Sequence, residues 1–142
     1  MESPNNPDNL AHPKVTGIGG IFFFSENPSA IKEWYAKNLG LEINAWGACS
    51  FESRVLDKPE EVQSLQWSPF KKNDPSFAPS TKEFMINYRV QNLEALLVKL
   101  RENGVTVLDE VATYDFGKFV HIMDAEGNKI ELWEPVNDIK PI

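Results

Sequence analysis

Two side chains near the end of the chain have the chemistry needed for proton transfer or metal binding. Glu131 lies in IELWEP and His121 lies in KFVHIMD, ten residues earlier. Both segments alternate like β-strands, and the turn residues of DAEGN between them predict a hairpin. If the two side chains share a face, they form a general acid–base pair or two ligands of a metal ion. The alternative is a lone histidine that hydrogen-bonds at the wall of a cavity.

The elements that position these residues begin after a polar segment. Residues 1–14 hold three prolines and three asparagines, and we expect a disordered tail there. Residues 15–24, VTGIGGIFFF, predict a strand whose three glycines permit close approach of backbone or ligand. Residues 26–40 predict a helix with Asn27 as N-cap and Gly40 past its end. Its buried face is expected to hold Ala30, Ile31, Trp34, Tyr35 and Leu39.

The remaining pattern is strand-like in the first half of the chain and then repeats. LEINAWG, ACSFESRVL and SLQWSPF are predicted strands, with DKPEEVQ as a polar connection before the last. After the linker KNDPSFAPST come a strand, EFMINYRV, and a helix capped by Asn92. Three strands follow: VTVLDEVATY, KFVHIMD and NKIELWE. The helix is expected to turn Leu93, Leu96, Leu97 and Leu100 inward.

The spacing of landmarks indicates an internal duplication of a β-α-β-β-β unit. Gln66 and Glu131 are 65 residues apart, and so are Gly20 and Met85. We therefore predict an α+β fold made of two βαβββ modules. Its boundaries are a single domain at 15–136, with module one at 15–70, a linker at 71–81, module two at 82–136 and a C-terminal tail at 137–142.

Composition limits the classes of function. The 142 residues with 42% hydrophobic content fit one compact domain. No apolar run approaches the roughly 20 residues of a membrane helix, and no signal peptide is evident, so no membrane partner is expected. The net charge of −7, with one adjacent basic pair, argues against nucleic acid. The lone Cys49 excludes an internal disulfide and favours a cytoplasmic location.

The repeated modules resemble a known superfamily. With WYAKNLGLEI in the first half, NLEALLVKLRENGVTV in the second and DAEGNKIELWEP at the end, the sequence is similar to the vicinal oxygen chelate superfamily, the glyoxalase, bleomycin resistance and ring-cleaving dioxygenase group. The resemblance covers about residues 15–136. It implies that the two modules form a curved mixed sheet around a central cup, which holds a small-molecule substrate and often a divalent metal. It also implies a homodimer.

The resemblance implies metal-ligand positions at Gly20, Gln66, Met85 and Glu131. Glu131 is a good hard ligand, and Gln66 offers a weaker carbonyl oxygen. Gly20 has no side chain, and the Met85 thioether suits copper(I). Two usable ligands are too few for a catalytic site, so no metal or other cofactor is expected. A divalent site completed by His121 and water is the alternative.

Alternation also predicts which side chains face the cup. The expected ligand contacts are Phe22, Phe24, Trp46, Gln66, Met85, Asn87, Arg89 and Trp133. Arg89 either anchors an anionic substrate group or pairs with Glu131 or another acid. The aromatic lining predicts a ligand with a hydrophobic or planar part and one polar handle.

Three functions stay open. The first is a small-molecule-binding member of the superfamily whose cup works without the usual metal, as a binding protein or as an enzyme. In the enzyme, Glu131 acts with His121 or a tyrosine in proton transfer. The second is a metal-dependent lyase, isomerase or dioxygenase. The third is a resistance-type protein that sequesters a cationic drug, which the acidic net charge permits.

Overall fold

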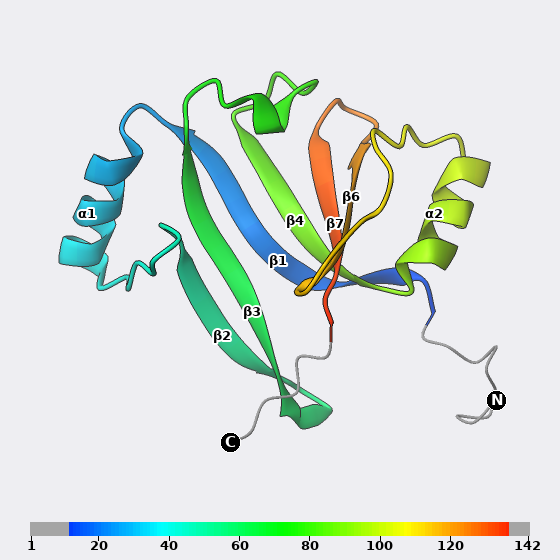
Figure 1. Ribbon diagram of the computed structural model, residues 1–142, viewed down its shortest axis with the longest axis horizontal. Helices are drawn as coiled ribbons and strands as arrows, with labels where there is room; N and C mark the ends of the chain where they lie inside the picture. Colours follow the sequence, from blue (N-terminus) through cyan, green and yellow to red (C-terminus); the bar gives the residue numbers. More distant parts are fainter. Residues whose placement is uncertain (1–11, 137–142) are drawn as a thin grey trace.

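The computed structural model describes residues 12–136, which form one curved seven-stranded sheet and two helices (Figure 1). Helix α1 spans Pro28–Leu39, helix α2 spans Leu93–Glu102, and a 3-10 turn, η1, spans Pro75–Phe77. This architecture confirms the predicted α+β class. The strands are β1 (Lys14–Ser25), β2 (Cys49–Val55), β3 (Lys58–Lys71), β4 (Phe84–Gln91), β5 (Ala112–Tyr114), β6 (Gly117–Met123) and β7 (Lys129–Glu134).

The sheet topology repeats around its two central strands. The strand order is β2-β3-β1-β4-β7-β6-β5, with β1 and β4 antiparallel at the junction of the two halves. β1 pairs in parallel with β3, placing Gly20 opposite Gln66, and β4 pairs in parallel with β7, placing Asn87 opposite Glu131. Asn87 is therefore the equivalent of Gly20, and the predicted equivalence with Met85 is wrong. The first half is two residues longer between Gly20 and Gln66 than the second half is between Asn87 and Glu131.

Residues 41–47 do not form the predicted strand. The side-chain oxygen of Asn44 accepts hydrogen bonds from the backbone N–H groups of Trp46 and Ala48, at 3.0 and 3.1 Å. This side-chain bonding closes a turn in place of a strand ladder. The described part of the first half consequently has one strand fewer than a βαβββ unit.

Two other strand boundaries differ from the prediction. Residues 57–63 are not a polar connection, because β3 begins at Lys58 and extends the hairpin with β2. Residues 105–114 do not form one strand either. Val107 makes an isolated bridge to Ile122, and β5 begins only at Ala112.

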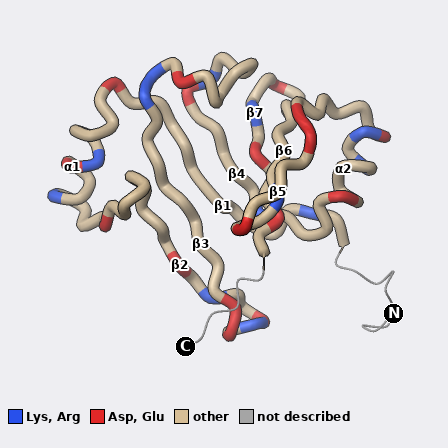
Figure 2. Tube along the Cα trace, in the orientation of Figure 1, with Lys and Arg blue, Asp and Glu red and all other residues tan. Residues whose placement is uncertain are grey.

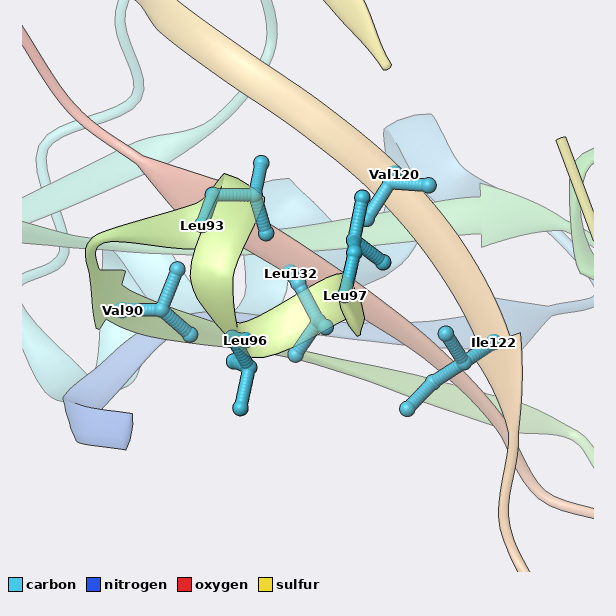
Figure 3. Close-up of a cluster of buried hydrophobic side chains, with 7 residues drawn as sticks. All are labelled: Val90, Leu93, Leu96, Leu97, Val120, Ile122 and Leu132. Carbon is cyan, nitrogen blue, oxygen red and sulfur yellow. The ribbon is translucent and has the colours of Figure 1, made fainter. Parts of the chain in front are cut away.

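The main hydrophobic core of the described residues lies between α2 and the second half of the sheet (Figure 3). Helix α2 buries three leucines, as predicted, and Leu100 packs against the cluster. Full burial of such a side chain contributes about 1.5–3 kcal/mol, so this cluster anchors the strands that carry the site. Its members are Val90, Leu93, Leu96, Leu97, Val120, Ile122 and Leu132.

The two helices begin differently. Asn27 caps α1 as predicted, accepting a hydrogen bond from the Ala30 N–H at 3.1 Å. Asn92 is the N-cap residue of α2, as predicted, but it takes a left-handed conformation and its side chain makes no cap hydrogen bond. Instead, the carboxylate of Glu134 on β7 accepts a hydrogen bond from the Leu93 N–H at 2.7 Å. Within residues 12–136, no helix is long and apolar enough to span a membrane.

Helix α1 does not bury the predicted apolar face. None of its residues is buried, and Trp34 and Leu39 remain 53% and 60% exposed. Its nearest aromatic contact to the sheet joins Tyr35 and Trp67, with ring centres 4.7 Å apart. Figure 1 shows α1 beyond the β2–β3 side of the sheet, at the opposite end from α2. Within the described chain, the apolar face of α1 is therefore not buried against the sheet, whereas that of α2 is.

Candidate functional site

The β6–β7 turn sets the position of the two candidate acid–base residues. The Asp124 carboxylate accepts hydrogen bonds from the backbone N–H and the side-chain amide of Asn128, at 2.9 and 2.7 Å. Gly127 supplies the positive φ, +80°, that the turn requires. In the resulting register His121 lies directly opposite Glu131. The two side chains share one face of the hairpin, as alternation predicts.

Four polar side chains form a continuous hydrogen-bonded chain on this face. A bond of 2.8 Å joins His121 Nε2 to Glu131 Oε2. The side-chain amide of Asn87, on β4, donates to Glu131 Oε1 at 2.7 Å. At the other end, a bond of 2.7 Å joins His121 Nδ1 to Asp109 Oδ2. Glu131 is therefore held through both oxygens, and the imidazole is held through both nitrogens.

Asp109 was not among the residues singled out from the sequence. It reaches His121 because residues 105–109 run along the outer edge of β6, with Leu108 N–H donating to the His121 carbonyl at 2.8 Å. The His121 N–H donates in turn to Asp109 Oδ1, also at 2.8 Å. The only signal in the sequence is an acidic residue within the strand-like run VTVLDEV. The pairing that brings it to the histidine is a tertiary contact.

The surroundings of His121 favour its charged form. Burial alone lowers the pKa of the imidazole, but hydrogen bonds and charge attraction from Glu131 and Asp109 outweigh burial and raise the pKa above its ordinary value. The histidine side chain is 21% exposed and Glu131 is 16% exposed, so water screens this pair only in part. The two carboxylates therefore favour the protonated imidazole.

A cavity of about 400 Å³ opens beside this chain of hydrogen bonds. Tyr114 and Phe116, on the β5–β6 hairpin, stack with ring centres 5.3 Å apart and are 53% and 58% exposed. Phe119 stacks on Trp133 at 5.7 Å, and the indole N–H of Trp133 donates to the Phe116 carbonyl at 2.8 Å. The cavity is lined by Asp109, Ala112, Tyr114, Phe116, Phe119, His121 and Glu131.

Two of the predicted ligand contacts lie in another cluster. Phe22 packs against Phe70 at 5.4 Å, and Phe24 stacks on Phe77 at 4.5 Å. Phe77 comes from η1 in the linker and is 1% exposed, so it fills the space that these rings face. Met85 is buried opposite Phe22. These side chains do not line the cavity beside Glu131.

Trp46 and Gln66 are also separate from that cavity. Trp46 sits in the turn after α1, is 88% exposed and is not among the residues that line this cavity. The Gln66 side-chain amide donates to the hydroxyls of Ser50 and Ser64, at 3.0 and 3.3 Å. Ser50 lies opposite Gln66 as His121 lies opposite Glu131. The first half of the chain thus carries a neutral counterpart of the ionisable pair.

Arg89 is buried behind the aromatic wall. Its guanidinium donates to the Ser64 carbonyl at 3.0 Å and lies 4.8 Å from the centre of the Trp133 ring. Whether Arg89 binds an anionic substrate group or pairs with an acid stays a prediction. A Cβ at Gly19 would approach Trp133 and Arg89 within 2.9 and 3.0 Å. Glycine in β1 therefore leaves room for the side chains that back the pocket.

Comparisons with known proteins identify the fold. No family model matches the sequence, and no curated protein matches it. Among solved structures, methylmalonyl-CoA epimerase from Mycobacterium tuberculosis is 25% identical, with TM-score 0.56 over 89% of this chain and 93% of that chain. The Streptomyces coelicolor epimerase in complex with 2-nitronate-propionyl-CoA is 17% identical, with TM-score 0.61 over 87% and 99%. A glyoxalase/bleomycin resistance protein/dioxygenase superfamily member from Vibrio splendidus 12B01 is 11% identical, with TM-score 0.52 over 87% and 99%.

The chain adopts the vicinal oxygen chelate fold. This confirms the resemblance that the closing motif DAEGNKIELWEP and the two modules indicated. A shared fold leaves the chemistry to be argued from the residues at the site.

Vicinal oxygen chelate proteins often hold a divalent metal in the cup, and the residues here do not fit that role. The four positions equivalent by register are Gly20, Gln66, Asn87 and Glu131. Both oxygens of Glu131 are bonded, to Asn87 and His121, and Gly20 has no donor. Residues 12–136 contain no cluster of three or more His, Cys, Asp or Glu arranged to hold a metal ion. Two of these four positions, Asn87 and Glu131, are hydrogen-bonded to each other.

Proposed function

We propose that this vicinal oxygen chelate protein binds a small, partly hydrophobic molecule against the β5–β6 aromatic wall, and that Glu131 and His121 transfer a proton on that molecule. The observation that carries the proposal is the 2.8 Å bond between His121 Nε2 and Glu131 Oε2 at the edge of a 400 Å³ cavity. Apolar ring surface and an acid–base pair then meet in one cavity, as a catalytic site requires.

The chemistry that suits this pair is removal and return of a proton at carbon. Glu131 takes the proton from a carbon next to a carbonyl group, and the electron pair of the broken C–H bond delocalises onto the carbonyl oxygen. The carboxyl then returns a proton to the same carbon or to a conjugated atom, so the step needs no oxidant or reductant. His121 and Asn87 hold the carboxylate in place throughout.

The comparison at 25% identity agrees with this class of reaction. That protein is named an epimerase, and an epimerase that acts at a C–H carbon removes a proton and returns it to the opposite face. The name does not identify the substrate of this chain. The aromatic lining of the cavity instead favours a ligand that carries a ring or another planar apolar group beside its carbonyl.

A second candidate is a binding protein for an organic cation, without turnover. The cavity is lined by two carboxylates, Asp109 and Glu131, and by four aromatic or imidazole rings, with no lysine or arginine among the lining residues. Ring faces and carboxylates both attract a cationic group. A metal-dependent reaction has no comparable support, because the register positions lack the donors for it.

A homodimer remains part of the proposal. Within the described chain α1 leaves Trp34 and Leu39 exposed, and Ile18 and Ile21 on β1 are 38% and 40% exposed. The equivalent helix α2 buries its stripe on its own half of the sheet. A second copy of the chain, related by a two-fold axis, would cover these apolar surfaces on both subunits at once.

Ligand binding tests the location of the site. We expect ring-bearing carbonyl compounds to raise the melting temperature, and Phe116→Ala to weaken that effect because it removes half of the stacked Tyr114–Phe116 surface. The measurement is a thermal-shift titration with ring-bearing carbonyl compounds and with three probes of similar size that differ in charge: benzamide (neutral), benzoate (anionic) and benzamidine (cationic). Val98→Ala, at an exposed position on α2, is the control.

Stabilisation that survives unchanged in Phe116→Ala and in Tyr114→Ala would place the ligand elsewhere and contradict the proposal. A marked preference for benzamidine over benzamide, lost in Glu131→Gln, would favour the cation-binding candidate instead.

A further inference from the structure

Asp109 contacts His121 in a way that goes beyond a simple ion pair. One carboxylate oxygen accepts from the His121 backbone N–H at 2.8 Å, and the other is bonded to the ring Nδ1 at 2.7 Å. The two contacts fix both the backbone and the ring of the same residue. Residues 106 and 108 are themselves bonded to β6, so Asp109 approaches from a paired segment.

We infer that Asp109 is a positioning residue for the proposed reaction. It keeps a proton on His121 Nδ1, so that Nε2 faces Glu131 and is the nitrogen that exchanges a proton with the Glu131 carboxylate. A carboxylate only accepts hydrogen bonds, so the nitrogen that faces Asp109 is a donor. The opposite nitrogen, 2.8 Å from Glu131 Oε2, then exchanges its proton with the carboxylate at the cavity. This inference rests on the proposed function for its catalytic meaning, although the ring state can be measured without any ligand.

The groups that face the imidazole define what can alter this state. They are Asp109 from the segment before β5 and Glu131 from β7, and Tyr114 on β5 lines the same cavity. The partly exposed Asp109 is in contact with solvent, whereas Glu131 is held by the buried Asn87. The two carboxylates therefore play different parts, with Asp109 as the anchor and Glu131 as the reacting group.

The test uses the fact that the chain has two histidines, His12 and His121. Protein labelled with ¹⁵N in the histidine rings gives two sets of imidazole signals, and His12→Gln assigns them. Their ¹⁵N shifts are followed against pH in wild type, in Asp109→Asn and in the control Asp115→Asn, an exposed residue at the β5–β6 turn. We expect neutral His121 in wild type and in the control to carry its proton on Nδ1.

In Asp109→Asn the amide oxygen still accepts from the backbone N–H, while the amide nitrogen donates to Nδ1. The neutral ring should then switch its proton to Nε2, and His121 should titrate at a lower pH than in wild type. Proton exchange on a bound carbon acid should fall by about 10²-fold, because the shared proton is misplaced. Asp109→Ala should give the same loss of the Nδ1 proton.

An unchanged Nδ1–H tautomer in both Asp109 variants would overturn the inference, whatever their activity. If wild type shows no proton exchange on any bound compound, the proposed function fails, and the ring signals alone decide the role of Asp109.

Discussion

At the scale of single residues, the site depends on how one proton is held between His121 and two carboxylates. The equivalent positions in the first half of the sheet hold neutral residues. Ser50 and Gln66 are joined there by a hydrogen bond of 3.0 Å, where His121 and Glu131 are joined by one of 2.8 Å. At these paired positions, only the second half of the sheet carries ionisable side chains. The resulting asymmetry concentrates acid–base chemistry beside the β5–β6 hairpin.

The raised pKa of His121 predicts a specific dependence of stability on pH. The unfolded imidazole titrates near pH 6.5, and the folded one titrates higher, so the charged histidine stabilises the folded state fully below about pH 6.5. This contribution is lost as pH rises through the folded pKa. The free energy of unfolding, measured by urea titration, should therefore fall from about pH 6.5 upward in wild type and in His12→Gln.

His121→Gln should remove that fall, because glutamine does not titrate. Two results would contradict this: a wild-type free energy of unfolding that rises with pH above about 6.5, or the same fall with pH in His121→Gln. Either would show that the two carboxylates do not raise the pKa of His121.

At the scale of elements, the sequence predicted contacts between residues that are close along the chain. Alternation and turn chemistry predicted the hairpin that carries His121 and Glu131 and left open whether the two side chains meet; the register of the hairpin places them opposite each other. The leucine spacing of α2 likewise predicted its buried face. Both features follow from the local periodicity of one or two neighbouring elements.

The failures involve contacts or irregularities that local patterns do not encode. Asp109 reaches His121 through an edge bridge, and Phe77 fills space beside Phe24 from a linker that reads as polar. The first half is also two residues longer between Gly20 and Gln66 than the second half is between Asn87 and Glu131, which moved the equivalent of Gly20 from Met85 to Asn87. These misses arise from tertiary pairing and from a difference in segment length, and neither changes the hydrophobic period of the sequence.

At the scale of the whole molecule, the two halves of the sheet are unequally covered. The described core lies under α2, while α1 stands away from the sheet with its apolar side chains exposed (Figure 1). Acidic positions lie on the segment before β5 and at the β5–β6 turn, near the proposed pocket (Figure 2). The first half of the molecule therefore offers a surface for association, and the second half carries the proposed chemistry.

The proposed dimer gives a direct prediction of mass. Light scattering after size exclusion should report about twice the 16.1 kDa of one chain. Trp34→Lys should shift the species toward a monomer, because it buries a charge in an apolar interface. Val98→Lys, at an exposed apolar position on α2, is the matched control and should leave the mass unchanged. A monomeric wild type at high micromolar concentration would refute the proposed association.

The central claim is that Glu131 removes a proton from a carbon of a molecule held in the aromatic cavity and returns it. Hydrogen–deuterium exchange at that carbon measures this step even though the natural substrate is not known. Compounds that bind in the thermal-shift titration, including ring-bearing ketones such as phenylacetone, are incubated with the protein in D₂O, and loss of the C–H signal next to the carbonyl is followed by proton NMR. We predict exchange faster than in buffer alone with wild type, reduced by about 10²-fold or more in Glu131→Gln while binding persists. Equal exchange rates in the two proteins, or binding without any acceleration by wild type, would contradict the account.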